Sequence, residues 1–159
     1  MKKTMAQVAL TTVKHPYEIL REISTVNDTA LTVSTMQDGL PNGVVTKSTK
    51  AQIIMFGTDD EDEAGTWALY GQTRNGPAEL IATGTVALGD VETGEPDEYY
   101  ANNIVISVQK WLSTIVAIAA DNVSLYIAKL EFDCFGYDKI WLSLTKDTAA
   151  SLGAKIRWI

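Results

Sequence analysis

The chain has 159 residues, 46% of them hydrophobic and 21% charged, a composition typical of a globular domain and not of a disordered chain. Its net charge of −7 argues against a nucleic-acid backbone or an anionic membrane as the main partner. A single cysteine, Cys134, excludes an intramolecular disulfide and a metal cage of several cysteines, and we expect it to pack as a small hydrophobic residue. At this length we expect one domain over residues 1–159.

Short β-rich segments follow one another, separated by Gly, Pro, Asn and Asp. A first strand is predicted over residues 4–13, and His15-Pro16 ends it, because the residue before proline is pushed towards extended geometry. Residues 17–23 carry Ile and Leu at helical spacing, which predicts the one helical turn. After it the pattern predicts a loop over residues 37–50 and strands over residues 29–36, 51–57, 65–71, 78–88, 103–112, 113–120, 123–131, 137–145 and 153–159.

The clearest element is a β-hairpin over residues 65–88. Its turn contains Asn75-Gly76-Pro77, in which Asn and Gly tolerate a positive φ and Pro sets the exit of the chain. In the second strand Leu80, Ala82, Gly84, Val86 and Leu88 alternate with a more polar set, which is the period of a half-buried antiparallel strand. With about nine or ten such short strands and almost no helix, the fold class is all-β: a single antiparallel β-sandwich, or jelly-roll-like, domain.

Two acidic loops flank this hairpin. The first holds five acidic residues over 59–63, and the second holds five more over 90–98, so together they carry ten of the 20 carboxylates. Since both loops adjoin the same end of the hairpin, we expect them on one rim. Hard cations bind several oxygens on flexible loops, so a calcium site is one interpretation, with candidate ligands Asp59, Asp60, Asp62 and Asp90. The spacing does not match an EF-hand, and we favour the other interpretation, a solvated rim without metal or cofactor.

Catalytic groups are scarce. The one histidine, His15, lies far in sequence from Cys134, and no paired-histidine metal motif, phosphate-binding glycine loop or nucleophile elbow occurs. Glu131 and Asp133 are candidates for a buried carboxylate pair of the kind that hydrolyses glycosides, on the strength of their aromatic neighbours alone. We therefore expect no enzymatic activity. The longest apolar run, residues 115–120, is too short to span a bilayer, so no membrane partner is expected.

Aromatic residues are the better candidates for binding. Trp141 alternates with Ile140, Leu142 and Leu144, so it is expected on the opposite face from the core. There it either makes an outward contact, with a sugar or a protein, or is covered by a loop of the same domain. The full set of interface candidates also includes residues of the first strand and of the last: Trp158, Tyr99, Tyr100, Val8 and Leu10.

Several segments resemble small β-sandwich virion proteins of tailed bacteriophages, of the head-decoration (auxiliary capsid) type. The resemblance is carried by residues 67–71, 75–84, 135–142 and 148–158, the last ending in Gly-Ala-Lys-Ile-Arg-Trp. It implies a non-enzymatic structural protein located in the virion, assembled in the host cytoplasm. The implied partners are the major capsid protein or other virion proteins and copies of the chain itself, as a homo-oligomer.

In such a protein residues 1–14 are expected to form a strand or arm that contacts the assembly. The alternative function is a carbohydrate-binding β-sandwich module, with Trp141 or Tyr99-Tyr100 as the stacking platform and with calcium in the acidic rim. A small hydrolase is a third possibility, and it requires His15 or a buried carboxylate pair to lie in a pocket.

Overall fold

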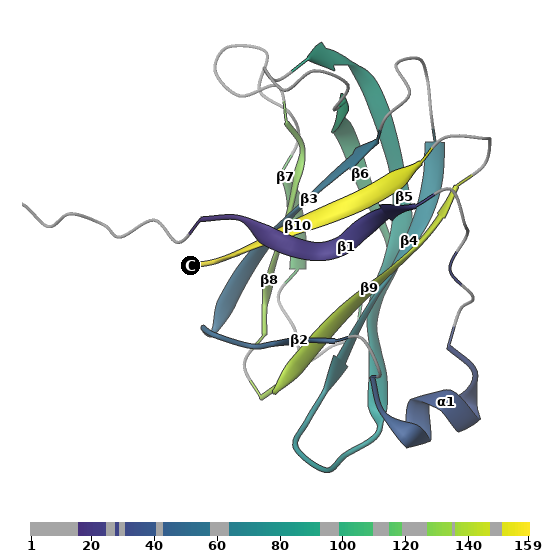
Figure 1. Ribbon diagram of the computed structural model, residues 1–159, viewed down its shortest axis with the longest axis vertical. Helices are drawn as coiled ribbons and strands as arrows, with labels where there is room; N and C mark the ends of the chain where they lie inside the picture. The colour runs from purple at the N-terminus through teal and green to yellow at the C-terminus, as the bar shows by residue number, and fades with distance from the viewer. Residues whose placement is uncertain are drawn as a thin grey trace, which may run out of the picture.

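A computed structural model shows how ten strands and one short helix are arranged (Figure 1). It describes residues 16–24, 28, 31–40, 43–57, 64–92, 99–109, 115–118, 127–134, 136–146 and 151–159. The elements, in chain order, are β1 (Glu18–Ser24), α1 (Val33–Asp38), β2 (Val44–Val45), β3 (Lys50–Gly57), β4 (Ala64–Gln72), β5 (Ala78–Glu92), β6 (Tyr99–Gln109), β7 (Ile115–Ile118), β8 (Lys129–Asp133), β9 (Lys139–Lys146) and β10 (Leu152–Trp158). The all-β fold predicted from the sequence is confirmed.

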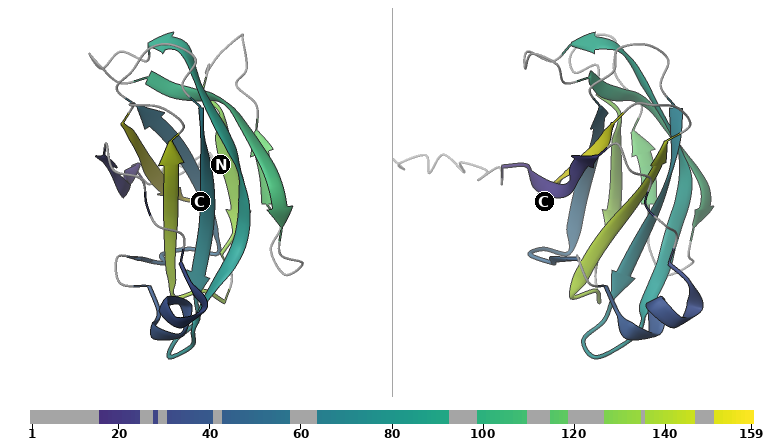
Figure 2. Two further views of the ribbon diagram at one scale, coloured as in Figure 1. Left: turned by 90° about the vertical axis from the view of Figure 1, so that its right-hand side faces the viewer. Right: turned by 45° about the vertical axis from the view of Figure 1, so that its right-hand side comes forward.

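The strands form two packed layers that are joined at one corner. One layer has the order β1-β10-β3-β8-β7, and the other has the order β6-β5-β4-β9-β2. They join where β3 pairs with β6 through Phe56 and Tyr100, so that every pairing is antiparallel and the sheet curves back on itself (Figure 2). The sandwich is therefore partly closed, which leaves fewer free strand edges.

Residue 28 ties the first strand to the opposite layer. The carboxylate of Asp28 accepts hydrogen bonds from Arg21 Nε at 2.8 Å and Arg21 Nη2 at 2.6 Å, and a third from the backbone N–H of Leu144 in β9 at 2.9 Å. The backbone N–H of Asp28 donates back to the Leu144 carbonyl at 3.0 Å. A bidentate charge-assisted pair of this kind holds β1 of one layer against β9 of the other.

The core lies between the layers and follows the alternation of the strands. In β3 the residues Ala51, Ile53 and Met55 are completely buried against the second layer, while Gln52 and Ile54 point to the other side. Trp67, Phe132 and Leu142 fill the centre of the core. Burial of each such side chain stabilises the folded state by about 1.5–3 kcal/mol, because its apolar surface is removed from water.

The hairpin of β4 and β5 is the longest paired unit and confirms the predicted turn. Asn75 has φ of 59°, and the N–H of Gly76 donates to the Thr73 carbonyl at 2.9 Å. The predicted alternation of the second strand changes at a β-bulge, where the register shifts after Leu69–Ala82 to Tyr70–Leu80. Ile81 is the extra residue of the bulge, so it joins the main core, while Leu80 turns to the outer face.

Two local predictions are wrong. Residues 18–24 form strand β1 and not a helical turn, because Leu20 enters the core when β1 pairs with the distant strand β10. Residues 33–38 form α1 and not a strand, because the Thr32 hydroxyl accepts a hydrogen bond from the N–H of Thr35 and so caps the helix. Residues 37–50, predicted as a loop, also contain β2. The predicted strand over residues 4–13 lies outside the described residues.

Candidate functional site

The outer face of β9, β4, β5 and β6 is divided into a covered half and an open half. The covered half begins with Trp141, whose ring stacks on Tyr70 with centroids 5.5 Å apart and an interplanar angle of 29°. Leu31, Met36 and Leu40, from the α1 segment, pack with these two rings and with Leu80. Gln72 fixes this cover, because its side chain accepts from the N–H of Leu40 at 3.2 Å and donates to the Gly76 carbonyl at 2.8 Å.

Of the two sequence-based alternatives for Trp141, cover by a segment of the same domain is therefore the one that the structure contains. The indole is half-buried in a small apolar cluster on the outside of the sheet. A side chain held in this way supplies packing energy to the monomer and has only part of one edge left for an external ligand.

Most of the rest of this outer face has no such cover among the described residues, although Ser143 is buried, Ala68 packs against the covered cluster and the Thr145 hydroxyl donates to the Asp28 carbonyl. We call it the open face, and it consists of Thr66, Ala68, Thr83, Thr85, Val105, Ser107, Val108, Ser143 and Thr145. Strand register aligns these side chains in two rows across four strands. Thr145, Thr66, Thr85 and Val105 form one row. Ser143, Ala68, Thr83 and Val108 form the next row towards Trp141.

The open face is uncharged and hollowed in its middle. None of its nine residues is ionisable, in a chain of which 21% of the residues are charged. A shallow trough of about 270 Å³ lies between the strands, lined by seven open-face residues together with Trp67 and Gly84. Val105 and Val108 stand at the side of the trough with 46% and 56% of their surfaces exposed. Charged residues are depleted in the buried centres of protein interfaces, and the open face shares this one feature with them.

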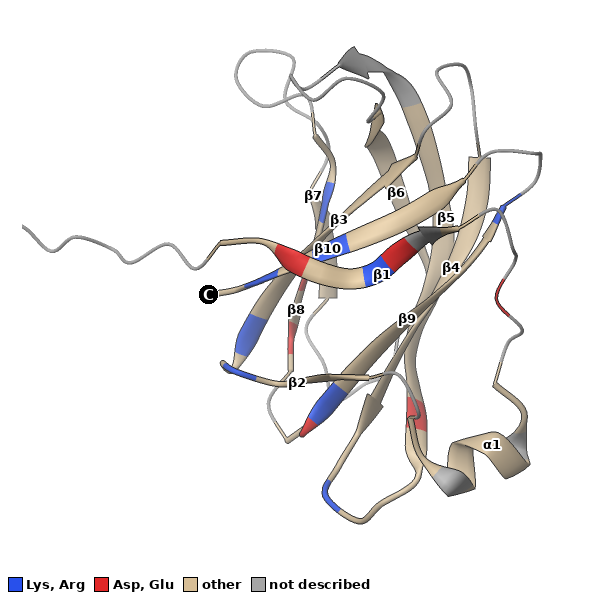
Figure 3. Cartoon of the chain, viewed as in Figure 1, with Lys and Arg blue, Asp and Glu red and all other residues tan. Residues whose placement is uncertain are grey.

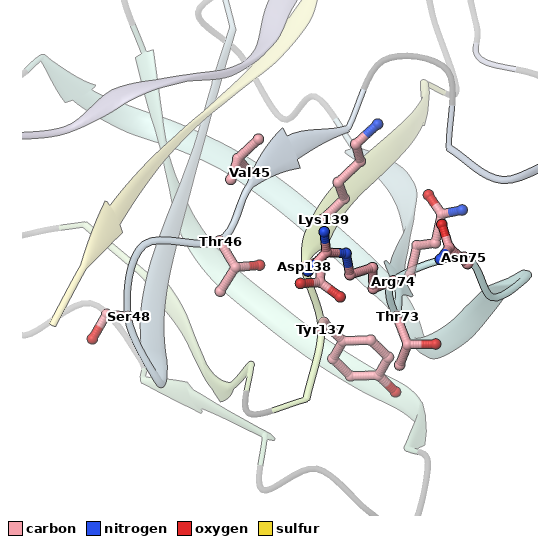
Figure 4. A pocket seen from close by; sticks show the side chains of 10 residues that line it. Val45, Thr46, Ser48, Thr73, Arg74, Asn75, Tyr137, Asp138 and Lys139 are labelled. Carbon is pink, nitrogen blue, oxygen red and sulfur yellow. The ribbon is translucent and has the colours of Figure 1, made fainter.

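A groove of about 520 Å³ lies at the end of the molecule that carries the β4–β5 turn (Figure 4). It runs between the β2 segment, the turn and the start of β9, and its walls are mainly polar. They are formed by Val45, Thr46, Ser48, Gln72, Thr73, Arg74, Asn75, Tyr137, Asp138 and Lys139.

The groove has unused hydrogen-bonding capacity. Thr46 Oγ1 is buried and has no partner among the described residues, and neither Arg74 nor Lys139 forms an ion pair within that part of the chain. The ring of Tyr137 packs directly on Gly71, in the space that a side chain at position 71 would fill. It is therefore part of the groove wall and does not present a free face on which a sugar could stack. The groove therefore offers cations, a carboxylate and hydroxyls to a polar ligand, but no free aromatic face.

The acidic segments adjoin the opposite end of the sandwich. Gly57 and Glu92, which precede residues 58–63 and 93–98, both pair with Tyr99. The strand ends that flank the two segments are thus neighbours, as the sequence predicted. The calcium candidates Asp59, Asp60 and Asp62 lie outside the described residues, as does the side chain of Asp90, and no cluster of three metal-ligating residues occurs within the described part.

Charges within the described part are dispersed over the strands (Figure 3). Glu18 on β1 is bound by two partners: Lys47 at 2.5 Å and the indole Nε1 of Trp158. The hydrogen bond from Lys47, followed by the one from Trp158, lowers the pKa of Glu18 below its ordinary value. Tyr17, beside it, has its pKa raised, since burial outweighs the nearby Arg157 cation at 5.0 Å from the ring.

The other predicted interface residues are distributed between the core and the outside of the first layer. Trp158 is 2% exposed and belongs to the core, so it has almost no surface to offer in the monomer. Tyr100 is buried against Phe56, and Lys155 Nζ lies 3.0 Å from its hydroxyl and 4.6 Å from the Phe56 ring centroid. Tyr99 is half-buried. Val8 and Leu10 lie outside the described residues.

None of the candidate catalytic groups comes together in a cavity of the described structure. His15 lies outside the described residues, and Glu131 Oε2 accepts a hydrogen bond from Gln52 at 2.9 Å in the paired strands β8 and β3. Cys134 is buried, with Sγ 2.9 Å from the Ser48 carbonyl, and burial raises the pKa of its thiol to about 11. Within the described part, no helix has the length and apolar character that crossing a bilayer requires.

The open face is the feature that sequence analysis missed. Its signal was present as alternate Thr, Ser, Ala and Val positions without a charge in four separate strands, but only the strand register brings them together. Comparisons with protein-family models, with curated proteins and with solved structures found no match for the chain.

Proposed function

We propose that this chain is a non-enzymatic structural protein of a virus particle, which acts by adhesion to neighbouring proteins. The observation that carries the proposal is the open face, an uncharged and partly apolar surface over four strands of an otherwise acidic molecule. A surface of this composition loses little when it is desolvated, because it holds no ion that must give up its hydration.

The sequence resemblance to decoration proteins of tailed bacteriophages is the reason that we propose a virus particle as the assembly. In this proposal the protein is located in the virion and assembles in the host cytoplasm, where it binds the major capsid protein or other virion proteins and copies of itself. Residues 1–14, with Val8 and Leu10 as candidate contacts, extend the interface along a neighbour. Strand addition of this kind uses backbone hydrogen bonds for affinity.

Repetition of the same contact on a particle explains how weak contacts between individual proteins are enough for stable attachment. A face built from Thr, Ser, Ala and Val gains less per residue than one built from large aromatic anchors. On a particle, however, each copy makes the same contacts many times in a fixed lattice, and linked weak contacts add through a high effective concentration. The proposal therefore requires low affinity in solution and stable attachment on the particle.

The test is to locate the chain on purified particles of the virus that encodes it. We expect an antibody against the chain to label the particle surface in electron micrographs, and quantitative mass spectrometry to give many copies per particle. A variant without residues 1–14 is expected to keep the far-ultraviolet spectrum of the folded domain and to be missing from the particles. Purified particles that contain no copy of the chain would contradict the proposal.

A second candidate function, carbohydrate binding, is favoured by the groove at the turn end. Its cations, carboxylate, amide and hydroxyls are the groups that bind sugar hydroxyls, and among the described residues the buried Thr46 Oγ1 beside them has no partner. The site would differ from the aromatic platform expected from the sequence, because Trp141 is covered and Tyr100 is buried. A glycan array with the wild type and with Arg74→Ala tests it: binding lost in the variant supports the function, and no bound glycan in the wild type contradicts it.

A further inference from the structure

We infer that the groove at the β4–β5 turn binds an acidic sugar, one that carries a carboxylate beside its hydroxyl groups. This inference rests on the second candidate function, carbohydrate binding, and names the class of sugar and the residues that select it. It is independent of the virion proposal, which uses the open face, a different surface of the molecule.

The backbone of Asp138 joins the two sides of the groove. Its N–H donates a hydrogen bond to the Gln72 carbonyl of β4 at 2.8 Å, and its carbonyl accepts one from the N–H of Thr46, next to β2, at 2.9 Å. Thr46 therefore lies on one side of Asp138, and Arg74, in the turn, lies on the other (Figure 4). With a volume of about 520 Å³, the groove falls within the roughly 300–1,000 Å³ of small-molecule sites.

Only part of the polar lining is engaged by the protein itself. The Ser48 hydroxyl donates to a backbone carbonyl at 2.6 Å, and the Gln72 side chain bonds to two backbone groups. Within the described part of the chain, by contrast, Arg74, Asp138 and Lys139 form no ion pair, either with one another or with other residues. Two cations and one carboxylate give the lining a net charge of +1, in a molecule whose net charge is −7.

These charged groups match the two kinds of group on an acidic sugar. An arginine guanidinium binds a carboxylate through two parallel hydrogen bonds, each about twice as strong as a bond between neutral groups. The ionised carboxylate of Asp138 only accepts hydrogen bonds, so it suits the hydroxyls of the ligand. The ring of Tyr137 packs on Gly71 and leaves no aromatic face for stacking, so a neutral sugar has neither a stacking contact nor a charge-to-charge contact in the groove.

The Thr46 hydroxyl is an independent indication of a ligand. Its oxygen is buried, points towards Asp138 and has no hydrogen-bond partner among the described residues (Figure 4). Buried polar atoms nearly always have a partner, because one without a partner destabilises the folded state. A threonine hydroxyl both donates and accepts, so a sugar hydroxyl in the groove is a suitable partner for it.

The acidic segments lie too far away to repel such a ligand. The strand ends that flank them are at the other end of the hairpin, and the nine residues of β4, at about 3.4 Å each, separate the two ends by roughly 30 Å. Interactions between exposed charges are largely screened beyond about 8 Å at physiological ionic strength. The charge of the groove, and not the net charge of the molecule, therefore governs binding.

Calorimetric titration of the full chain tests the inference with two sugars that differ in one group. D-glucuronic acid carries a carboxylate where D-glucose carries a hydroxymethyl group, and we expect it to bind at least about tenfold more tightly. Arg74→Gln is expected to abolish this preference. Lys50→Gln is the matched control, because Lys50 is exposed and outside the groove lining and its loss removes the same unit of charge, so the preference is expected to remain.

A variant of Thr46 separates binding from folding. Thr46→Val keeps the shape of the side chain and removes a hydroxyl that has no partner among the described residues, so its melting temperature is expected to be no lower than that of the wild type. Its affinity for glucuronic acid is expected to fall at least about threefold, because the hydrogen bond to the ligand is lost. Unchanged affinity in Arg74→Gln or in Thr46→Val would overturn the site.

The remaining outcomes distinguish the inference from the functions on which it builds. Equal binding of glucose and glucuronic acid overturns the inference and leaves carbohydrate binding standing. Inorganic phosphate bound as tightly as glucuronic acid also overturns it, because the groove would then select an anion and not a sugar. If neither sugar binds, the inference and the second candidate function both fail, while the location of the chain on particles tests the virion proposal separately.

Discussion

Trp141 and Tyr70 lie on directly paired positions of β9 and β4 and stack on the outside of the sheet, 5.5 Å between ring centroids. The pair marks the boundary between the half of the outer face that the α1 segment covers and the half that is open. What lies on one side of this boundary stabilises the monomer, and what lies on the other side is the surface that the proposed function assigns to a partner.

The first prediction concerns this stack. Trp141→Ala is expected to lower the free energy of unfolding by about 2–3 kcal/mol, less than a fully buried tryptophan would cost, because the ring is partly exposed. Urea denaturation measures the change, with the exposed Thr66→Ala on the paired strand β4 as a control within about 0.5 kcal/mol of wild type. If Trp141→Ala is as stable as the wild type, the Trp141 ring does not stabilise the monomer and is free to contact an external ligand.

The second prediction concerns Gly84, on the core side of β5. A Cβ at this position would lie 1.7 Å from the Val105 carbonyl oxygen and 2.7 Å from the Trp67 ring. Gly84→Ala must displace either the backbone of β6 or the largest side chain of the core, so we expect a loss of at least about 3 kcal/mol. The neighbouring outward substitution Thr83→Ala is the control, and equal melting temperatures for the two variants would contradict the packing described.

The third prediction follows from the lowered pKa of Glu18. A group with a lowered pKa in the folded state stabilises the fold above its ordinary pKa, and this contribution is lost as the pH falls through the folded-state pKa. Glu18→Gln is expected to be less stable than wild type at pH 7, by less than about 1 kcal/mol because water screens the pair.

Below the folded-state pKa of Glu18 both side chains are neutral, and the two stabilities are expected to converge. Melting curves at pH 7 and at acidic pH, compared as a difference between the two proteins, isolate this group from the other carboxylates. A difference that stays constant with pH would mean that Glu18 has no special environment in the folded state.

The fourth prediction concerns the thiol of Cys134. With a pKa of about 11 and no accessible surface, it is expected not to react with a disulfide reagent at pH 8 while the protein is folded. One equivalent is expected to react when urea unfolds the chain. Immediate reaction of the native protein would place Cys134 at the surface, where it would also react in the maleimide labelling of Thr85→Cys described below.

How far the sequence predicts this molecule depends on whether a pattern is local. The β4–β5 hairpin is predicted correctly because Asn75 and Gly76 set the turn within a few residues. The region over residues 17–36 is predicted wrongly because its structure depends on distant partners. Leu20 is ordered by β10, and the six-residue α1 is held by contacts of Met36 with the Trp141 cluster, although Thr and Val favour strands locally.

The candidate site depends on distant partners even more strongly. Thr66, Thr85, Thr145 and Val105 belong to four strands, and each is unremarkable in its own strand. Only the register makes them one uncharged row. Trp158, which the sequence analysis named as an interface candidate, is instead buried in the core on the same side of its strand as Ile156, since alternate residues of a strand share a face.

The most direct test of the central claim, that the open face is covered by protein in the assembly, is the rate at which a maleimide labels Thr85→Cys in the free protein and on purified particles. Thr73→Cys, at the turn, reports the labelling of an exposed position. We predict that Thr85→Cys is labelled readily in the dilute free protein and at least about tenfold more slowly on the particle, by analogy with the exclusion of water from buried interfaces. Equal labelling rates in the two states would show that the open face remains uncovered, and would contradict the account.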